Sequence, residues 1–473
     1  MRLLFATLLI IANTAHAQDV VKLSGKIQNP LSDSVEVSYN DNWIAYYPHE
    51  YYARLDTKGN FSITFPAPHS IYLQAEIKHG NKIAEVMITA GDNLTIAVNA
   101  AHFDSTIRYS GKGREVANFI ARHTVEKGRM NQYTLKMKAD MSKEPADFLS
   151  AIEKEKKNEI DFLNKNRTGL PASFIQYFTA FYQYYNYFFM QQYPQIHEMV
   201  KLKRYTDTIP EINYSVLKQM PYAFNDTFIP VPPYLLYLTG VFEIKLKAAG
   251  LGYLGKDSLK QRRLQDSVYN LAYNVLPDKS GEYFIAQALY GGAKYQALEK
   301  TEKQFSDFKK RWPGSPYLPL LDKQISMAER LAPGQPAPDI DIATPDGRRM
   351  KLSDLKGKVV YLGFWASWCR QCVGEMIGEH KIKDLIKDKP LEFVYVSIDE
   401  DTTTDNMLIK KYKMEGIFTH PGGGWNAKEI NLYGVQGLPA YFLIDEDGKF
   451  AVQNAPTPQQ STELILAIEK LFK

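Results

Sequence analysis

Both cysteines of the 473-residue chain lie in one short stretch, FWASWCRQCVGEM at residues 364–376, with two residues between Cys369 and Cys372. A pair at this spacing can do redox chemistry, because one thiolate can attack a substrate disulfide and the other can then resolve the mixed disulfide. A chain of this length can bury sizeable hydrophobic cores and does not need disulfides to hold its fold together. We therefore expect the pair to be chemical rather than structural.

The elements that flank the pair predict how its sulfurs are activated. KVVYLGFW is typical of a buried strand, and VGEMIGEHKIKDLIKD predicts a helix. The cysteines thus lie at the start of a helix, where unpaired N–H groups and the helix dipole favour a thiolate over a thiol. Cys369 gains most from this position, whereas Cys372 is one turn further in, more buried, and placed to resolve a mixed disulfide.

Three other uses of the C-x-x-C spacing fit the sequence less well. Zinc needs two further ligands, but the chain has no second cysteine pair, and His380 and His420 lie at no recognised ligand spacing. Haem attachment needs a histidine directly after the second cysteine, where this chain has Val373. A structural disulfide at an exposed helix start would be strained and easily reduced, so it would stabilise little. The sequence therefore predicts no metal site.

The rest of the chain divides into segments of different character. Residues 20 to about 100 hold short, mostly alternating runs separated by turn residues, which predict an antiparallel β-sandwich. Long periodic segments such as FLSAIEKEKKNEIDFLNKN then predict an all-α region, with a last helix at about 319–331. Beyond the proline-rich LAPGQPAPD, strands and helices alternate as in an α/β fold. We predict a β-sandwich domain at 18–102, a helical domain at 103–331 and an α/β domain at 332–473.

The first residues predict export. Arg2, the apolar run Leu3–Ala12 and the small-x-small site ending at Ala17 are typical of a signal peptide, residues 1–17, cleaved after Ala17. The apolar run is too short to span a bilayer, and no cysteine follows Ala17 for lipid attachment. A periplasmic location is therefore expected. The formal net charge of +4 is small for this length and argues against binding of nucleic acid.

The segment LPASFIQYFTAFYQYYNYFFMQQYP, residues 170–194, has no charged residue and many aromatic ones. It is as long as a membrane-spanning helix, but its glutamines, asparagine and tyrosines would place polar groups in lipid without partners. A buried helix of an all-helical domain is the simpler interpretation, and a partner-binding face is the alternative. We do not expect the mature protein to span a membrane.

Residues 333–473 resemble the thioredoxin-fold domain of the TlpA/ResA-type exported thiol-disulfide oxidoreductases. The resemblance rests on APDIDIATPDGRRMKLSDLKGKVV, FWASWCRQC, VYVSIDED and GVQGLPAYFLIDEDGK, and W-C-x-x-C with a later G-x-P-x-x-x-x-I-D is a specific combination. It implies that Cys369 is the nucleophile and Cys372 the resolving thiol. It also implies that Pro439 is the cis-proline beside the disulfide and Trp368 the tryptophan that flanks the site.

The resemblance extends to supporting residues. Glu375 matches the glutamate of the C-x-x-C-x-x-E pattern, which assists proton movement at the cysteines, and a solvated helix carboxylate is the alternative. The Leu438 backbone is expected to pair with the substrate chain. Arg370 either stabilises the thiolate or is a surface charge, and Arg370-Gln371 replaces the Gly-Pro that tunes the redox potential in thioredoxins. Gly363 stands where cytosolic thioredoxins keep a buried aspartate, so the direction of electron flow stays open.

The sequence therefore predicts a multidomain exported oxidoreductase that reduces or isomerises protein disulfides. Cys369–Cys372 is its expected redox group; no flavin or nicotinamide fingerprint is visible, so electrons are expected from a membrane partner. A peroxiredoxin-like thiol peroxidase is the alternative enzyme, but it needs a threonine where this chain has Ala366. A binding or assembly protein whose thioredoxin module only docks is a further alternative. The front of the chain resembles the region of unassigned function that precedes many exported bacterial thioredoxin modules.

Overall fold

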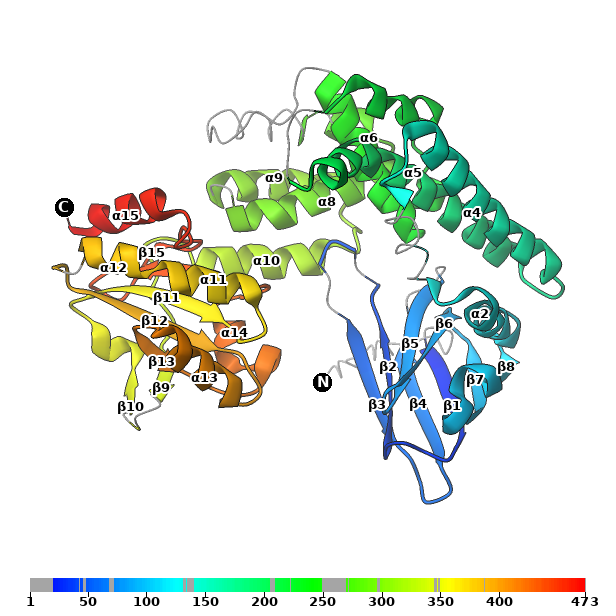
Figure 1. Ribbon diagram of the computed structural model, residues 1–473, viewed down its shortest axis with the longest axis horizontal. Coiled ribbons are helices and arrows are strands. Elements are labelled where there is room, and N and C mark those ends of the chain that lie inside the picture. The colour runs from blue at the N-terminus through cyan, green and yellow to red at the C-terminus, as the bar shows by residue number, and fades with distance from the viewer. Residues whose placement is uncertain are drawn as a thin grey trace, which may run out of the picture. The chain divides into compact units, whose positions relative to one another are not determined.

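The computed structural model (Figure 1) divides into two compact units, Met1–Phe284 and Ile285–Lys473. It describes residues 20–41, 43–45, 48–67, 72–130, 133, 140–204, 209–221, 223–248, 269–270, 272–295, 298–343, 347, 349–386 and 388–472. The predicted signal peptide at 1–17 lies outside the described residues.

The first unit begins with two four-stranded sheets, ordered β4-β1-β7-β8 and β3-β2-β5-β6. Alternate side chains are buried along strands such as β4 and β7, and residues of both sheets share one hydrophobic core. The strands are β1 (Val20–Gln28), β2 (Ser34–Tyr39), β3 (His49–Arg54), β4 (Asn60–Pro66), β5 (Leu73–His79), β6 (Lys82–Ile88), β7 (Asn93–Asn99) and β8 (Arg108–Lys112).

Pairing in this region differs from the sequence prediction in two respects. The prediction of a wholly antiparallel arrangement is wrong at one pair, because β1 and β7 run parallel. The sheet also continues beyond residue 102, since β8 pairs with β7, so the segment after 102 is not purely helical. The sequence did not predict β3 and β8, because neither strand has an alternation of apolar residues. β8 buries only Tyr109, and β3 buries no residue fully.

Helices make up the remainder of the first unit. They are η1 (Ala100–His102), α1 (Phe103–Thr106), α2 (Arg114–Lys127), α4 (Pro145–Lys165), α5 (Ala172–Leu202), η2 (Glu211–Gln219), η3 (Asp226–Phe228) and α6 (Pro232–Ala248), while α8 (Asp278–Tyr295) crosses the division between the units.

The aromatic segment predicted as a buried helix lies in α5. Its Phe178 and Tyr182 are fully buried, and Asn186 bonds to the Ile152 carbonyl and to the Tyr133 hydroxyl. The carboxamide of Asn186 is thus paired inside the protein, as the burial of a polar side chain requires, whereas the Tyr177 hydroxyl and Gln191 Oε1 are buried without a hydrogen-bond partner among the residues that the structure describes. Within the described part of the chain, no helix has the length and apolar character needed to cross a membrane.

The second unit contains a five-stranded sheet of order β13-β12-β11-β14-β15, in which β11, β12 and β13 are parallel and β14 and β15 antiparallel. In Figure 1, α11, α12 and α15 lie over one face of this sheet and α13 over the other. The elements are α9 (Leu298–Arg311), α10 (Leu318–Arg330), β9 (Asp341–Ala343), β10 (Arg349–Lys351), η4 (Leu352–Leu355), β11 (Val359–Trp365), α11 (Arg370–Gly378), α12 (His380–Ile386), β12 (Leu391–Ser397), α13 (Thr403–Tyr412), β13 (Ile417–Thr419), η5 (Gly424–Asn426), α14 (Lys428–Leu432), β14 (Ala440–Ile444), β15 (Phe450–Val452), α15 (Ser461–Glu469) and η6 (Lys470–Phe472).

The central strand of this sheet positions the cysteines. All seven residues of β11 are buried, which explains its continuous apolar sequence, and a four-residue loop, residues 366–369, then leads into α11. The single helix predicted over 373–388 is instead two helices, α11 and α12, with Glu379 between them.

Helix α10 packs on the α/β fold of its own unit. Leu331, just after α10, belongs to the same hydrophobic core as β11, and Met327 packs against that core. A Cβ built on Gly434 would lie 2.8 Å from Cγ of Met327, so the helix approaches the backbone closely at this glycine. The boundary predicted near 332 therefore separates α10 from the α/β fold in sequence but not in packing.

Candidate redox site

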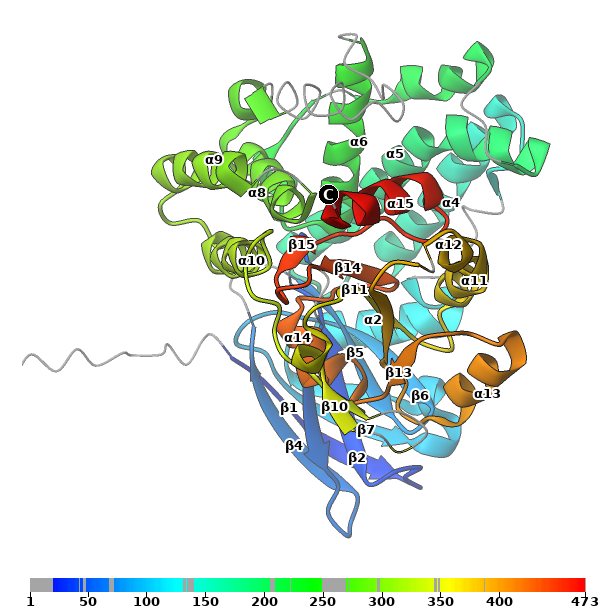
Figure 2. The same cartoon turned by 90° about the vertical axis from the view of Figure 1, so that its left-hand side faces the viewer.

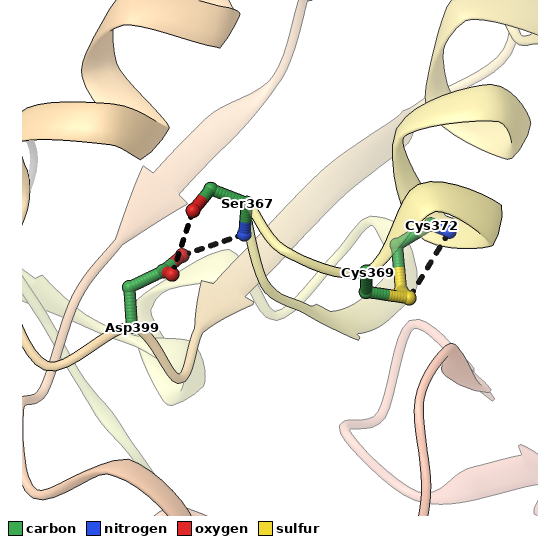
Figure 3. Close-up of a disulfide and its surroundings, with 4 residues drawn as sticks. All are labelled: Ser367, Cys369, Cys372 and Asp399. Carbon is green, nitrogen blue, oxygen red and sulfur yellow. Dashed lines mark hydrogen bonds between the residues drawn. A yellow bond between two sulfur atoms is a disulfide. The ribbon is translucent and has the colours of Figure 1, made fainter. Parts of the chain in front are cut away.

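Cys369 and Cys372 form a disulfide with an S–S distance of 2.05 Å. Cys369 is the N-cap residue of α11, and its sulfur accepts a hydrogen bond from the Cys372 N–H at 3.2 Å (Figure 3). Cys369 is 9% exposed and Cys372 is fully buried. Cys369 is therefore the more exposed residue of the pair and caps the positive end of a helix, whereas Cys372 lies one turn inside.

A buried carboxylate holds the segment that leads to the cysteines. Asp399, only 6% exposed, accepts hydrogen bonds from the Ser367 N–H at 2.7 Å and from the Ser367 hydroxyl at 2.8 Å (Figure 3). The Ser397 hydroxyl donates a third bond at 3.0 Å. Ser367 lies two residues before Cys369, so Asp399 anchors the loop between β11 and α11. Sequence reasoning missed this residue, although the polar Ser397 and Asp399 at the end of an apolar strand were a signal.

Two tryptophans, Trp368 and Trp425, lie near the segment that contains Cys369. Trp368 is 58% exposed, and its ring centroid lies 6.3 Å from that of Trp425, itself 45% exposed. Trp425 was not predicted, because η5, which carries it, is distant in sequence. Arg370 and Gln371 are exposed on the first turn of α11.

The predicted cis-proline is found at its expected place. The Leu438–Pro439 bond is cis. Ala440, the next residue, pairs with Phe364 of β11, so Leu438 and Pro439 lie beside the end of the strand that leads to Cys369. Both residues are partly exposed.

Glu375 is not a solvated carboxylate, so that alternative is wrong. It is 2% exposed, and its Oε2 accepts a hydrogen bond from the Gln459 N–H at 2.8 Å. Glu379 is 1% exposed, accepts a hydrogen bond from the Tyr395 hydroxyl and lies 3.2 Å from Lys383 Nζ. Cys372 and Glu375, three residues apart, lie on the core face of α11, and Glu379, directly after the helix, is buried as well.

Gly363 stands where cytosolic thioredoxins have a buried aspartate, and here two tyrosine rings lie against this position. A Cβ on Gly363 would lie 2.9 Å from Tyr441 and 3.1 Å from Tyr395. Burial, followed by the nearby Glu379 and then Glu375, raises the pKa of the Tyr441 hydroxyl, which therefore stays protonated at neutral pH. Burial and Glu379 likewise raise the pKa of Tyr395. The buried acidic groups near the disulfide thus come from α11 and the residue that follows it, and not from the central strand.

Two of the alternatives raised by the sequence, a thiol peroxidase and a metal site, concern residues at or near this disulfide. Ala366 is fully buried where a peroxidatic threonine would stand, and it has no hydroxyl. Among the described residues, no group of three or more His, Cys, Asp or Glu side chains is arranged to hold a metal ion.

A mixed sheet whose central strand runs into a C-x-x-C disulfide at a helix start, with a cis-proline beside it, defines a thioredoxin-type oxidoreductase. The Redoxin family profile matches residues 332–463. The thiol-disulfide oxidoreductase ResA of Bacillus cereus is 31% identical over 152 residues, which cover 32% of this chain and 86% of that protein. The ResA of Bacillus thuringiensis subsp. konkukian is 32% identical with the same coverage, 32% and 86%. Through this C-terminal region the chain belongs to the TlpA/ResA-type family of thioredoxin-fold thiol-disulfide oxidoreductases.

Solved structures include the thioredoxin domain of a thiol-disulfide oxidoreductase from Bacteroides vulgatus. The two chains are 26% identical, and the match covers 30% of the present chain and 99% of the solved domain, with a TM-score of 0.28.

Proposed function

We propose that the protein is an exported enzyme that reduces or isomerises protein disulfides by dithiol exchange at Cys369 and Cys372. The observation that carries the proposal is the asymmetry of the pair. Cys369 is the N-cap residue of α11 and is 9% exposed, whereas Cys372 is fully buried. Such an arrangement suits attack by the outer sulfur and resolution by the inner one.

The exchange proceeds in two balanced steps. In the dithiol form, the Cys369 thiolate attacks one sulfur of a substrate disulfide; a mixed disulfide forms and the other substrate sulfur leaves as a thiolate. Cys372 then loses its proton and attacks Cys369, so that the intramolecular disulfide forms and the second substrate sulfur leaves. Two electrons pass from the enzyme to the substrate. The two substrate thiolates are protonated by the proton from Cys372 and by one taken up from solvent, which balances the proton that Cys369 released when it became a thiolate.

Neighbouring groups serve these steps in the proposal. Asp399 and Ser367 hold the loop before Cys369 in place. Glu375, one helical turn beyond Cys372 and buried, receives the Cys372 proton, as in the family pattern. The backbone at Leu438 pairs with the substrate chain.

Export, recycling and the role of the front of the chain complete the proposal. A signal peptide cleaved after Ala17 would place the enzyme in the periplasm. Return of the disulfide to the dithiol needs a two-electron donor, for which we propose a membrane redox protein. Residues 18–331, a β-sandwich followed by helices, would place the redox domain or recruit a partner.

The test is reduction of insulin disulfides by the full chain with dithiothreitol as electron source, together with the equilibrium potential of Cys369–Cys372 against glutathione. Turnover that disappears in Cys369→Ser supports the proposal. A potential of about −270 mV indicates a reductant, and one of about −120 mV indicates an oxidant. Peroxide consumption faster than disulfide reduction would favour the peroxidase alternative and contradict the proposal.

A further inference from the structure

A cavity of about 470 Å³ lies beside Pro439, and one of its walls is not part of the thioredoxin fold. Gln324 and Met327 of α10 line it together with Leu331. Figure 2 shows α10 next to β15, the edge strand of the sheet. The cavity lies wholly within the second unit.

Two segments that line the cavity connect it to the redox site. The first is the stretch that ends in Pro439 and Ala440, beside the end of β11. The second is the loop between β15 and α15, residues 453–460, whose Gln459 N–H bonds to Glu375 of α11. A chain that reaches the accessible sulfur of Cys369 past Pro439 therefore has this cavity beside it.

The lining is rich in carboxamide side chains. A carboxamide offers both donors and acceptors, as a peptide backbone does, so such a lining suits a polypeptide in extended conformation. Glu463 is the one charged residue among those that line the cavity. The carboxamides are Gln324, Gln436, Gln453, Asn454 and Gln460.

Gln324 of α10 and Gln436 are hydrogen-bonded to each other, and the space beside the backbone of the neighbouring Gly437 is unoccupied by described residues. Gln436 Nε2 donates to Gln324 Oε1 at 2.8 Å, which links the stretch before Pro439 to α10. Gln436 is exposed and Gln324 is buried. No atom lies within 4 Å of the place that a Cβ on Gly437 would take, so an extended chain can approach this backbone closely.

We infer that α10 forms one wall of the substrate-binding groove and that Gln324 and Gln436 bind the polypeptide that flanks the substrate cysteine. The inference rests on the proposed function and adds to it a binding surface, formed partly by α10, for the extended polypeptide beside the substrate disulfide. Gln324 and Gln436 are specificity-determining residues in this scheme, and the sulfur chemistry stays with the cysteines.

The test compares two substrates of the full chain: insulin, which presents polypeptide, and 5,5′-dithiobis(2-nitrobenzoate), which does not. In the double variant Gln324→Ala/Gln436→Ala, kcat/KM for insulin is expected to fall about tenfold, mainly through KM, as for the loss of one or two hydrogen bonds. The rate with the small disulfide and the potential of the pair should not change. Lys323→Ala, exposed on α10, is the matched control and should leave both rates unchanged.

The outcomes separate the two proposals. If the wild-type chain reduces neither substrate, the proposed function fails. If it reduces both, and the double variant loses nothing with insulin or loses equally with both substrates, the groove inference alone is overturned.

A second experiment does not depend on how the variant folds. Cys372→Ser is loaded with a cysteine-containing peptide that carries p-benzoylphenylalanine two residues from its cysteine. After irradiation, mass spectrometry should find crosslinks within residues 324–331. Crosslinks that fall only on the Trp425 segment would place the peptide on the other side of the site and overturn the inference.

Discussion

The strands of the N-terminal sheets and the central strand of the redox domain bury their side chains differently. β7 alternates exposed and buried residues, so it presents one face to its core and one to solvent. β11 is buried at all seven positions. Because β11 is covered on both faces, reactive groups can be accessible only at its end, where Cys369 follows. The comparison teaches that the place of the redox site follows from how the strand before it is buried.

One aspartate in each region shows how the loops differ: Asp56 is exposed and bonds to its sequence neighbours, whereas Asp399 is buried and bonds to a distant segment. Asp56, exposed, accepts hydrogen bonds from Asn60 and from the Lys58 N–H, and these bonds hold its pKa below the ordinary value. Asp399, buried, accepts three hydrogen bonds and anchors the segment before Cys369. A local turn needs only neighbours in sequence, whereas the redox loop is held by a residue 32 positions away.

The largest expected effect is on insulin reduction, which changes in the redox domain should abolish and changes in the N-terminal sheets should not alter. Cys369→Ser should abolish reduction of insulin, because no thiolate remains to attack, and Cys372→Ser should accumulate a mixed disulfide with the substrate. Thr95→Ala, on the exposed face of β7, should leave turnover unchanged. Non-reducing gels and turnover rates measure these results. Equal trapping by both cysteine variants would contradict the assignment of the nucleophile.

Asp399→Asn tests the contrast between the two loops. The change weakens a charge-assisted set of hydrogen bonds worth about 1.5–3 kcal/mol each, so the loop before Cys369 should loosen and kcat/KM for insulin should fall up to about tenfold. Asp56→Asn is the matched change and should leave kcat/KM unaltered. If both variants slow turnover equally, Asp399 has no special role in positioning.

A glycine in each sheet gives a test of stability. Gly25→Ala would bring its Cβ to 2.4 Å from the Ile96 carbonyl oxygen, a backbone atom that cannot turn away, so a loss of about 3 kcal/mol is expected. Gly363→Ala meets the rings of Tyr441 and Tyr395, which can shift, so about 1 kcal/mol is expected.

Hydrogen exchange resolved by region measures each loss, because a chain of two units need not unfold in one step. Only Gly363→Ala should also change the rate of insulin reduction, since its tyrosines contact Glu379 or lie near it. A larger stability loss for Gly363→Ala than for Gly25→Ala would show that the tyrosine cluster is the more rigid environment.

The smallest effect concerns Asp92 in the N-terminal unit. Burial raises the pKa of this carboxyl above its ordinary 3.8, against the opposing hydrogen bond from the Thr89 N–H. The protonated form is therefore favoured in the folded state, and this contribution is lost as pH rises through the folded pKa. Asp92→Asn should gain thermal stability relative to wild type as pH is raised from about 3.5 to about 7. A difference in melting temperature that is constant with pH would contradict the shift.

Local sequence patterns located the candidate redox site and much of the fold. Apolar alternation located six of the strands in the first unit, and a continuous apolar run located β11, because these patterns record which faces of a strand are buried. The position of Cys369 and Cys372 at a helix start follows from a few adjacent residues, whereas the cis bond before Pro439 was expected from the family resemblance. For the same reason the aromatic segment in α5 was recognisable as a buried helix.

Only the tertiary structure decided which segments cover one another. The parallel pairing of β1 with β7, the bonds between Asp399 and Ser367, and the contact of Gln324 with Gln436 each join residues far apart in the chain. The burial of Glu375 likewise depends on a loop more than eighty residues away, with a separation of 84 to Gln459. A periodic pattern states that a face is buried but carries no label for the partner that buries it, since apolar packing is non-directional and is settled by the shapes of the assembled elements.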